Sequence, residues 1–148
     1  MPSILIDTNL LVYFYDPNSP DKQSQAETVL DHLQRVGMGC LSAQTLAEFV
    51  SVATRKLDRP LTPAQAYEQV SLLAEIWPVF DLTPLIVLEA ARGARDHGLA
   101  YYDAQIWAAA RLNQVTIVFS EDFSDGQTLE GVRFVNPFAP GFRLQDWL

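Results

Sequence analysis

Residues 3–9 read SILIDTN, and residues 3–6 of this stretch are predicted to form the first strand of the chain. A short apolar run without polar interruption is typical of a strand buried on both faces of a parallel sheet. Residues 116–120, TIVFS, form a second run of this kind that is rich in β-branched residues. Asp7 directly follows the first run, and Asp122 lies two residues beyond the second. Both stretches therefore predict strands that end close to a carboxylate.

Strand and helix patterns alternate along the rest of the chain. Further strands are predicted over residues 38–41, 79–82 and 131–135, and helices over residues 9–15, 21–36, 43–57, 64–77, 84–97 and 102–112. Gly37 and Gly98 follow two of these helices as C-caps. Alternating strands and helices require crossover connections, so the predicted fold class is α/β, with a central, mainly parallel sheet and helices on both faces. No linker or repeat interrupts the pattern, and we expect one domain over residues 1–148.

Composition restricts the class of protein further. A hydrophobic fraction of 49% in 148 residues is that of a globular domain with a proper core. The single cysteine, Cys40, forbids an internal disulfide, suits a reducing compartment and is expected to be a buried apolar residue. No segment approaches the ~20 apolar residues that span a bilayer, and the first apolar run lacks the basic start of a signal peptide. We therefore expect a cytoplasmic protein without a membrane partner.

The net charge of −8 bears on nucleic-acid binding. Broad electrostatic binding to nucleic acid needs a basic surface that displaces the counterions of the phosphates, and this composition argues against one. A protein of this charge that acts on a nucleic acid must obtain its phosphate affinity locally. Bound cations or a few arginines could supply it.

Two acidic residues stand where ligands gather in a parallel sheet. Ligands bind at the carboxyl ends of the strands, and Asp7 and Asp122 follow two predicted strands there. If these strands are neighbours, both carboxylates reach the same crevice. The alternative is that each carboxylate caps the helix or turn that follows it.

Two further carboxylates lie on predicted helices. Asp103 precedes the apolar residues of its own helix by three, four and seven positions, at Ile106, Trp107 and Ala110. Its carboxylate therefore points along the buried face, where a lone charge is costly unless it is paired or bound to a cation. An N-cap at the start of that helix is the alternative for Asp103. Glu48 flanks the apolar stripe of its helix and would by itself be a surface glutamate.

Four sequence blocks, taken in order, resemble the PIN-domain family. They are DTN at residues 7–9, AEF at 47–49, YYDAQIWAAA at 101–110 and SEDFSDG at 120–126. Within that family the chain resembles the small toxin nucleases of VapC type, and the likeness continues to GVRFVNPF at residues 131–138. The last block departs from the family pattern, because it has serine where threonine is commoner.

The resemblance implies a set of site residues. The acidic positions of the family fall on Asp7, Glu48, Asp103 and Asp122, the supporting polar positions fall on Thr8, Asn9 and Ser120, and Asp125 is an outer or extra ligand. Glu121 competes with Asp122 for the fourth place. We prefer Asp122, because it stands two residues beyond Ser120 as the family pattern expects.

Crowded carboxylates have a chemical consequence. They raise each other's pKa, and hard divalent cations with oxygen ligands relieve this, so a site without His or Cys favours Mg²⁺ or Mn²⁺. Such ions activate water for in-line attack on a phosphodiester. The resemblance implies an RNA substrate, products with 5′-phosphate and 3′-hydroxyl ends, a homodimer and a cognate antitoxin. The antitoxin would reach the carboxylates with a basic side chain such as arginine.

Other functions stay open at this point. A phospho-acceptor signalling domain needs a lysine after a late strand, whereas the chain has only Lys22 and Lys56. A phosphatase with an aspartate nucleophile would want a second acid where Asn9 stands. A catalytically silent binding module and a PIN nuclease of RNA processing are the remaining alternatives.

Overall fold

The computed structural model describes residues 4–147, and a six-stranded sheet forms its centre. The strands are β1 (Ile4–Ile6), β2 (Gly39–Ser42), β3 (Val79–Phe80), β4 (Ile117–Phe119), β5 (Thr128–Leu129) and β6 (Val132–Val135). Their spatial order is β3-β2-β1-β4-β6-β5, and every neighbouring pair is parallel except β5 with β6. The mainly parallel sheet is therefore confirmed. Ser3, which we expected in the first strand, lies outside the described residues.

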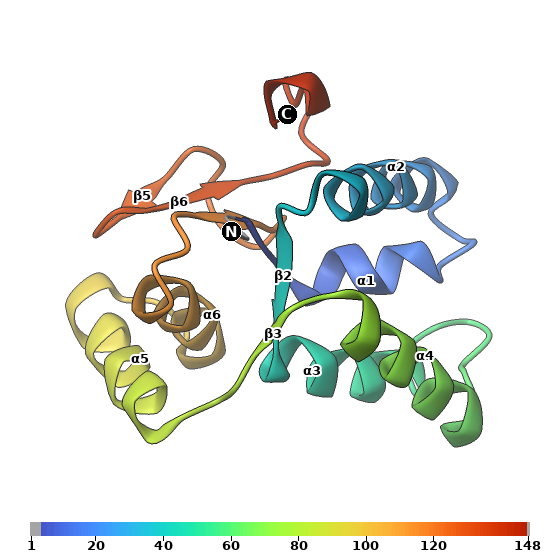
Figure 1. Cartoon of the computed structure of the whole chain (residues 1–148), viewed down its shortest axis with the longest axis horizontal. Helices are drawn as coiled ribbons and strands as arrows, with labels where there is room; N and C mark the ends of the chain where they lie inside the picture. Colours follow the sequence, from blue (N-terminus) through green and yellow to red (C-terminus); the bar gives the residue numbers. More distant parts are fainter. Residues whose placement is uncertain (1–3, 148) are drawn as a thin grey trace.

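Helices cover the sheet on both faces (Figure 1). They are α1 (Thr8–Phe14), α2 (Pro20–Val36), α3 (Ala43–Ala53), α4 (Pro63–Ile76), α5 (Pro84–His97) and α6 (Tyr101–Leu112), followed by a 3-10 helix, η1 (Leu144–Trp147). Gly37 and Gly98 follow α2 and α5 in the left-handed conformation, as the sequence predicts. None of the helices in the described part of the chain is long and apolar enough to cross a bilayer.

The alternation of side chains along β1 divides the interior into two cores. Ile4 and Ile6 pack in one core with residues of α1, α2 and α3, whereas Leu5 packs in the other with residues of α5 and α6. All three side chains are fully buried. A strand buried on both faces explains why the residues before Asp7 are uniformly apolar.

The pairing of β1 with β4 positions the site. The chain leaves β1 for β2 and β3 on one side, and β4 pairs with β1 on the other side. The sheet therefore changes winding direction between β1 and β4, where α/β folds open a crevice at the carboxyl ends. The strands that precede Asp7 and Asp122 are therefore neighbours, which was the condition for both carboxylates to reach the same crevice.

β3 ends at Phe80 rather than residue 82, η1 was not predicted, and two further elements differ from the sequence predictions by more than one residue. α3 ends at Ala53 rather than residue 57, because the Ala53 carbonyl accepts the N–H of Leu61 at 2.9 Å instead of continuing the helix. The short antiparallel strand β5 was not predicted. It pairs with β6 across Glu130 and Gly131, both at positive φ, and this two-residue turn lacks the usual Asn-Gly or Asp-Gly signal.

Candidate active site

Asp7 links the end of β1 to the start of α1. Its backbone N–H donates to the carbonyl of Phe119 in β4, and its carboxylate accepts the N–H of Thr8 at 2.7 Å as the N-cap of α1. The second carboxylate oxygen accepts a hydrogen bond from Ser120 Oγ, also at 2.7 Å. The side chain thus has the capping role considered from the sequence and also faces the carboxyl end of β4.

Ser120 connects Asp7 to Asp122. Its buried hydroxyl donates to Asp7, and it accepts the backbone N–H of Asp122 at 3.1 Å and Asn9 Nδ2 at 3.2 Å. These three bonds use its one donor and two acceptor sites. Asn9 Nδ2 also donates to Asp122 Oδ2 at 3.2 Å. Asn9 and Ser120 therefore support two carboxylates at once.

Glu48 reaches the same crevice from α3. It is half-buried, and its Oε2 accepts a hydrogen bond from Thr8 Oγ1 at 3.1 Å. Its Oε1 accepts Gln44 Nε2 at 2.5 Å, one helical turn earlier. Thr8 is the residue after Asp7, so the carboxylate of Glu48 is anchored to the end of β1. A solvated surface glutamate would have no such anchor.

Asp103 lies in the first turn of α6. The N-cap of α6 is Ala100, so the N-cap interpretation of Asp103 is wrong. The side chain is half-buried, and its burial raises its pKa, with further increases from the charges of Asp122 and Glu48. The first turn of a helix favours negative charge, which helps to accommodate this carboxylate.

Asp7, Glu48, Asp103 and Asp122 together form what we call the acidic crevice. Burial raises the pKa of Asp7 to about 7 against the opposing hydrogen bonds of Ser120 and Thr8, and the charges of Asp122 and Glu48 raise it further. Asp103 is affected by the same two neighbours. Among residues 4–147, no ion pair involves any of the four carboxylates. The crevice therefore concentrates negative charge without a protein cation to balance it.

Two candidate residues stand outside the acidic crevice. Asp125 is exposed, and its Oδ1 accepts the backbone N–H of Asn136 at 2.9 Å, so its hydrogen bond supports a loop. Glu121 accepts hydrogen bonds from Tyr13 Oη at 2.5 Å and Lys22 Nζ at 2.9 Å. The structure thus separates Glu121 from Asp122, and Asp122 is the residue whose carboxylate joins Asn9.

Sequence reasoning missed three residues around the crevice. Tyr13 and Lys22 hold Glu121, and Gln44 holds Glu48. A helical spacing of four gives a partial signal, because Tyr13 follows Asn9 by four residues and Gln44 precedes Glu48 by four. The contact between Lys22 and Glu121 joins positions 99 residues apart and leaves no such signal.

The donor set of the acidic crevice fits a hard divalent cation. It consists of carboxylate, hydroxyl and amide oxygens, which are the ligands that Mg²⁺ and Mn²⁺ prefer. Asn9 Oδ1 is buried and has no hydrogen-bond partner among the described residues. Within residues 4–147, no three acidic, histidine or cysteine side chains already stand close enough together to hold an ion, so side-chain rotation would accompany binding.

Solved structures share this fold. A toxin-antitoxin complex from Klebsiella pneumoniae superposes with a TM-score of 0.67 at 20% identity, covering 92% of this chain and 98% of that chain. FitAcB from Neisseria gonorrhoeae gives a TM-score of 0.64 at 21% identity, covering 90% and 97%. VapC20 from Mycobacterium tuberculosis, described as a sarcin-ricin loop cleaving toxin, gives 0.65 at 19% identity, covering 88% and 99%. At such identities the likeness concerns the fold alone.

The sequence itself carries the assignment to a family. No curated protein matches the chain. The family model for the PIN domain matches residues 4–124, a range that contains β1, β4 and the whole acidic crevice. Because the match covers most of the chain and agrees with the fold, this chain belongs to the PIN domain family.

Proposed function

We propose that the chain is a ribonuclease that depends on Mg²⁺ or Mn²⁺ and cleaves RNA phosphodiester bonds at the acidic crevice. One observation carries the proposal: Asp7, Glu48, Asp103 and Asp122 converge at the switch point of the sheet without a compensating protein cation. Membership of the PIN domain family supports the same chemistry.

The residues of the crevice have distinct tasks in this proposal. Asp7 is the most buried of the four carboxylates and would hold the cation together with Asp103, while Glu48 and Asp122 complete the ligand set. Ser120 and Asn9 orient Asp7 and Asp122, and Thr8 orients Glu48. When bound, a divalent cation supplies positive charge at the scissile phosphate and lowers the pKa of water. This local charge answers the objection from the net charge of −8.

We place the enzyme in the cytoplasm as the toxin of a toxin–antitoxin pair. Solved structures with this fold include toxin-antitoxin complexes. An inhibitor of this enzyme must neutralise the acidic crevice, and an arginine can do so through paired hydrogen bonds with carboxylates. A homodimer is part of the same proposal and rests on the resemblance to VapC-type toxins.

A cleavage assay tests the nuclease. The purified protein is incubated with RNA in Mg²⁺, Mn²⁺ or EDTA, and an Asp7→Asn variant prepared in parallel controls for contaminating ribonucleases. We expect cleavage that requires the metal, yields 5′-phosphate and 3′-hydroxyl ends, and is absent from the variant. Cleavage that survives in EDTA and in Asp7→Asn would contradict the proposal. A wild-type protein that neither cleaves RNA nor binds metal would favour the silent binding module.

Co-expression tests the partner. The chain is produced with the product of the neighbouring short reading frame, and the mixture is analysed by size-exclusion chromatography and by the cleavage assay. We expect a complex in which cleavage is inhibited, and a dimer of the chain when it is produced alone. An active monomer that its neighbour does not inhibit would instead indicate a PIN nuclease of RNA processing.

A further inference from the structure

A groove of about 500 Å³ adjoins the acidic crevice. We call it the side groove; its lining comes from α3, from the N-terminal part of α6 and from Leu82. Its other lining residues are Gln44, Ala47, Glu48, Ser51, Tyr102 and Gln105. Glu48 belongs to both the side groove and the acidic crevice, and Tyr102 directly precedes Asp103. A molecule bound in the side groove would therefore lie next to the carboxylates.

Tyr102 provides an aromatic surface in the side groove. Its side chain is 67% exposed, and its ring meets Tyr101 edge-on, with ring centroids 5.2 Å apart. The backbone beneath it is fixed, because the Tyr102 carbonyl accepts a hydrogen bond from Gln44 Nε2 at 3.0 Å. An exposed aromatic ring on a fixed backbone is the kind of platform on which unpaired bases stack.

Gln44 provides an unused hydrogen-bond acceptor. Its side chain is only 7% exposed, and its Nε2 is shared between Glu48 Oε1 and the Tyr102 carbonyl. Its Oε1 is buried and has no partner among the described residues. A buried carbonyl oxygen without a donor destabilises the fold, so a ligand N–H that reached it after the side chain adjusts would be favoured.

The charge of the side groove selects which part of a nucleotide enters it. No lysine or arginine lines it, and Glu48 brings a negative charge, so a phosphate would be repelled. A base is neutral and flat, and its edge carries N–H donors. The side groove therefore suits the base, while the phosphate lies at the acidic crevice, where a cation can compensate its charge.

We propose that the side groove binds one unpaired base of a single-stranded RNA, next to the scissile phosphate, with the base stacked on Tyr102 and its edge toward Gln44. The inference rests on the proposed ribonuclease function and gives the base next to the cut a binding site of its own beside the acidic crevice. Duplex RNA keeps its bases stacked within the helix and could not place one in the side groove.

The test compares Tyr102→Ala, Tyr102→Phe and the matched control Tyr67→Ala, a tyrosine on α4 that is also mostly exposed. Cleavage of a single-stranded oligonucleotide is measured alongside oligonucleotides in which each nucleotide flanking the cut is made abasic in turn. Base stacking is worth about 1–3 kcal/mol, so we expect Tyr102→Ala to lose about tenfold in kcat/KM. Tyr102→Phe and Tyr67→Ala should stay near wild type. On one of the abasic substrates, Tyr102→Ala should cause no further loss.

A binding measurement separates failure of this inference from failure of the proposed function. The same substitutions are made in an Asp7→Asn background, and the affinity for labelled intact and abasic RNA is measured by fluorescence anisotropy. If the wild-type protein cleaves RNA, two results would overturn the inference about the side groove. Tyr102→Ala could cleave as well as the wild type, or its loss of cleavage could be the same on intact and abasic RNA. A chain that never cleaves but binds intact RNA through Tyr102 overturns the nuclease and keeps the side groove. Loss of antitoxin binding alone in Tyr102→Ala would assign the side groove to the protein partner and overturn the inference.

Discussion

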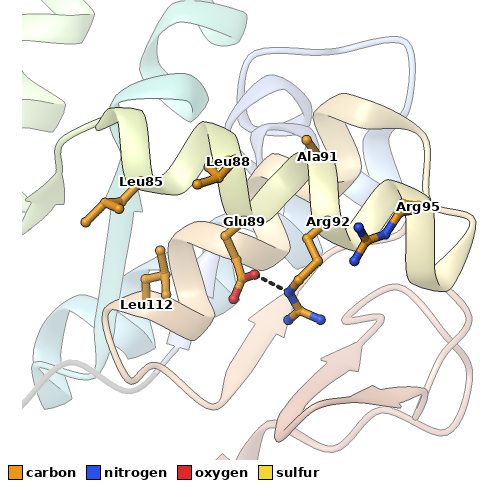
Figure 2. A pocket seen from close by; sticks show the side chains of 7 residues that line it. All are labelled: Leu85, Leu88, Glu89, Ala91, Arg92, Arg95 and Leu112. Carbon is orange, nitrogen blue, oxygen red and sulfur yellow. Dashed lines mark hydrogen bonds and ion pairs between the residues drawn. The ribbon is translucent and has the colours of Figure 1, made fainter.

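Two regions of the molecule concentrate carboxylates, the acidic crevice and the outer face of α5. On α5, Glu89 pairs with Arg92 at 2.5 Å, as Figure 2 shows, and with Arg111 of α6, also at 2.5 Å. Glu130, in the turn between β5 and β6, pairs with Arg92 and with His97. We call these residues, together with Asp96, the outer network. Every carboxylate in it has a cationic or histidine partner, whereas those of the acidic crevice have none.

The pKa values of Glu89 and Glu130 shift in the opposite direction to those of Asp7 and Asp103. Hydrogen bonds from Arg92 lower the pKa of Glu89, and His97 and Arg92 lower that of Glu130. Burial raises the pKa of Asp7 and of Asp103. A cluster of acidic residues therefore does not by itself indicate a cation site; carboxylates without a cationic partner are the better candidates.

The volume of a groove is also a poor guide to whether reactive groups line it. A groove of about 620 Å³ lies on the outer face of α5 and is larger than the side groove. Figure 2 shows Leu85, Leu88 and Leu112 around it, with Glu89 already paired to Arg92. It offers apolar surface and compensated charge, but no reactive group.

The largest expected effect concerns cleavage. Asp7→Asn and Asp103→Asn should each reduce RNA cleavage at least about a hundredfold, because metal-assisted stabilisation of the transition state is worth several kcal/mol. Glu89→Gln, the matched change in the outer network, should cleave like wild type. In EDTA at pH 8, Asp7→Asn should unfold at or above the wild-type temperature, because it removes a buried charge. Equal activity of Asp103→Asn and wild type would remove the distinction between the two regions.

The second effect concerns the metal. Mn²⁺ at about 100 times its Kd should raise the free energy of unfolding of the wild type by about 2.7 kcal/mol, since only the folded chain presents the site. Calorimetric titration and thermal unfolding with and without Mn²⁺ measure this. Glu89→Gln should keep the stabilisation and Asp7→Asn should lose it. The idea fails if both variants respond to Mn²⁺ like wild type.

The third effect concerns packing beneath the outer network. A Cβ at Gly93 would approach ring atoms of Trp107 to 2.5 Å, so Gly93→Ala should destabilise the fold by about 1–3 kcal/mol despite the better helix propensity of alanine. Gly141→Ala is the control, because a Cβ there meets nothing within 4 Å. Denaturant unfolding measures both variants. Cleavage by folded Gly93→Ala should equal that of wild type, and a selective loss of cleavage would show that the two regions are coupled.

The smallest effect concerns pH. Arg92 lowers the pKa of Glu89 in the folded chain, so this pair stabilises the fold above the unfolded pKa and its contribution disappears as pH falls through the lower folded pKa. Glu89→Gln should therefore cost about 1 kcal/mol or less near pH 7 and nothing in strong acid. Urea unfolding at several pH values measures the difference from wild type. A cost that grew as the pH fell would contradict this assignment.

The strand ends of the site could be predicted from the sequence. The runs before Asp7 and Ser120 are apolar because their strands are buried on both faces, and this pattern depends only on local composition. The parallel neighbours and the common edge follow from the crossover connections. The resemblance to the PIN-domain family, rather than periodicity, supplied Glu48, whose position on α3 has no distinctive pattern of its own.

The remaining features depend on contacts between distant residues. The end of α3 is set by the bond from Leu61 to the Ala53 carbonyl, and the position of Glu121 is set by Lys22. The side groove requires α3 to lie beside the first turn of α6, an arrangement fixed by Gln44 and the Tyr102 carbonyl. Neither composition nor helical spacing reports such contacts.

The burial of α6 leaves the carboxylates of the acidic crevice with unequal freedom to move. Residues 104–110 are all buried, so this helix cannot turn or slide without disturbing packing on every side. Asp103 lies in the first turn of this buried helix, and Asp7 is fixed between β1 and β4. Asp122 is exposed, and its carboxylate is held by a single hydrogen bond from Asn9. A cation bound at the acidic crevice would therefore find Asp7 and Asp103 on fixed backbone, and Asp122 is the carboxylate with the most freedom to adjust to it.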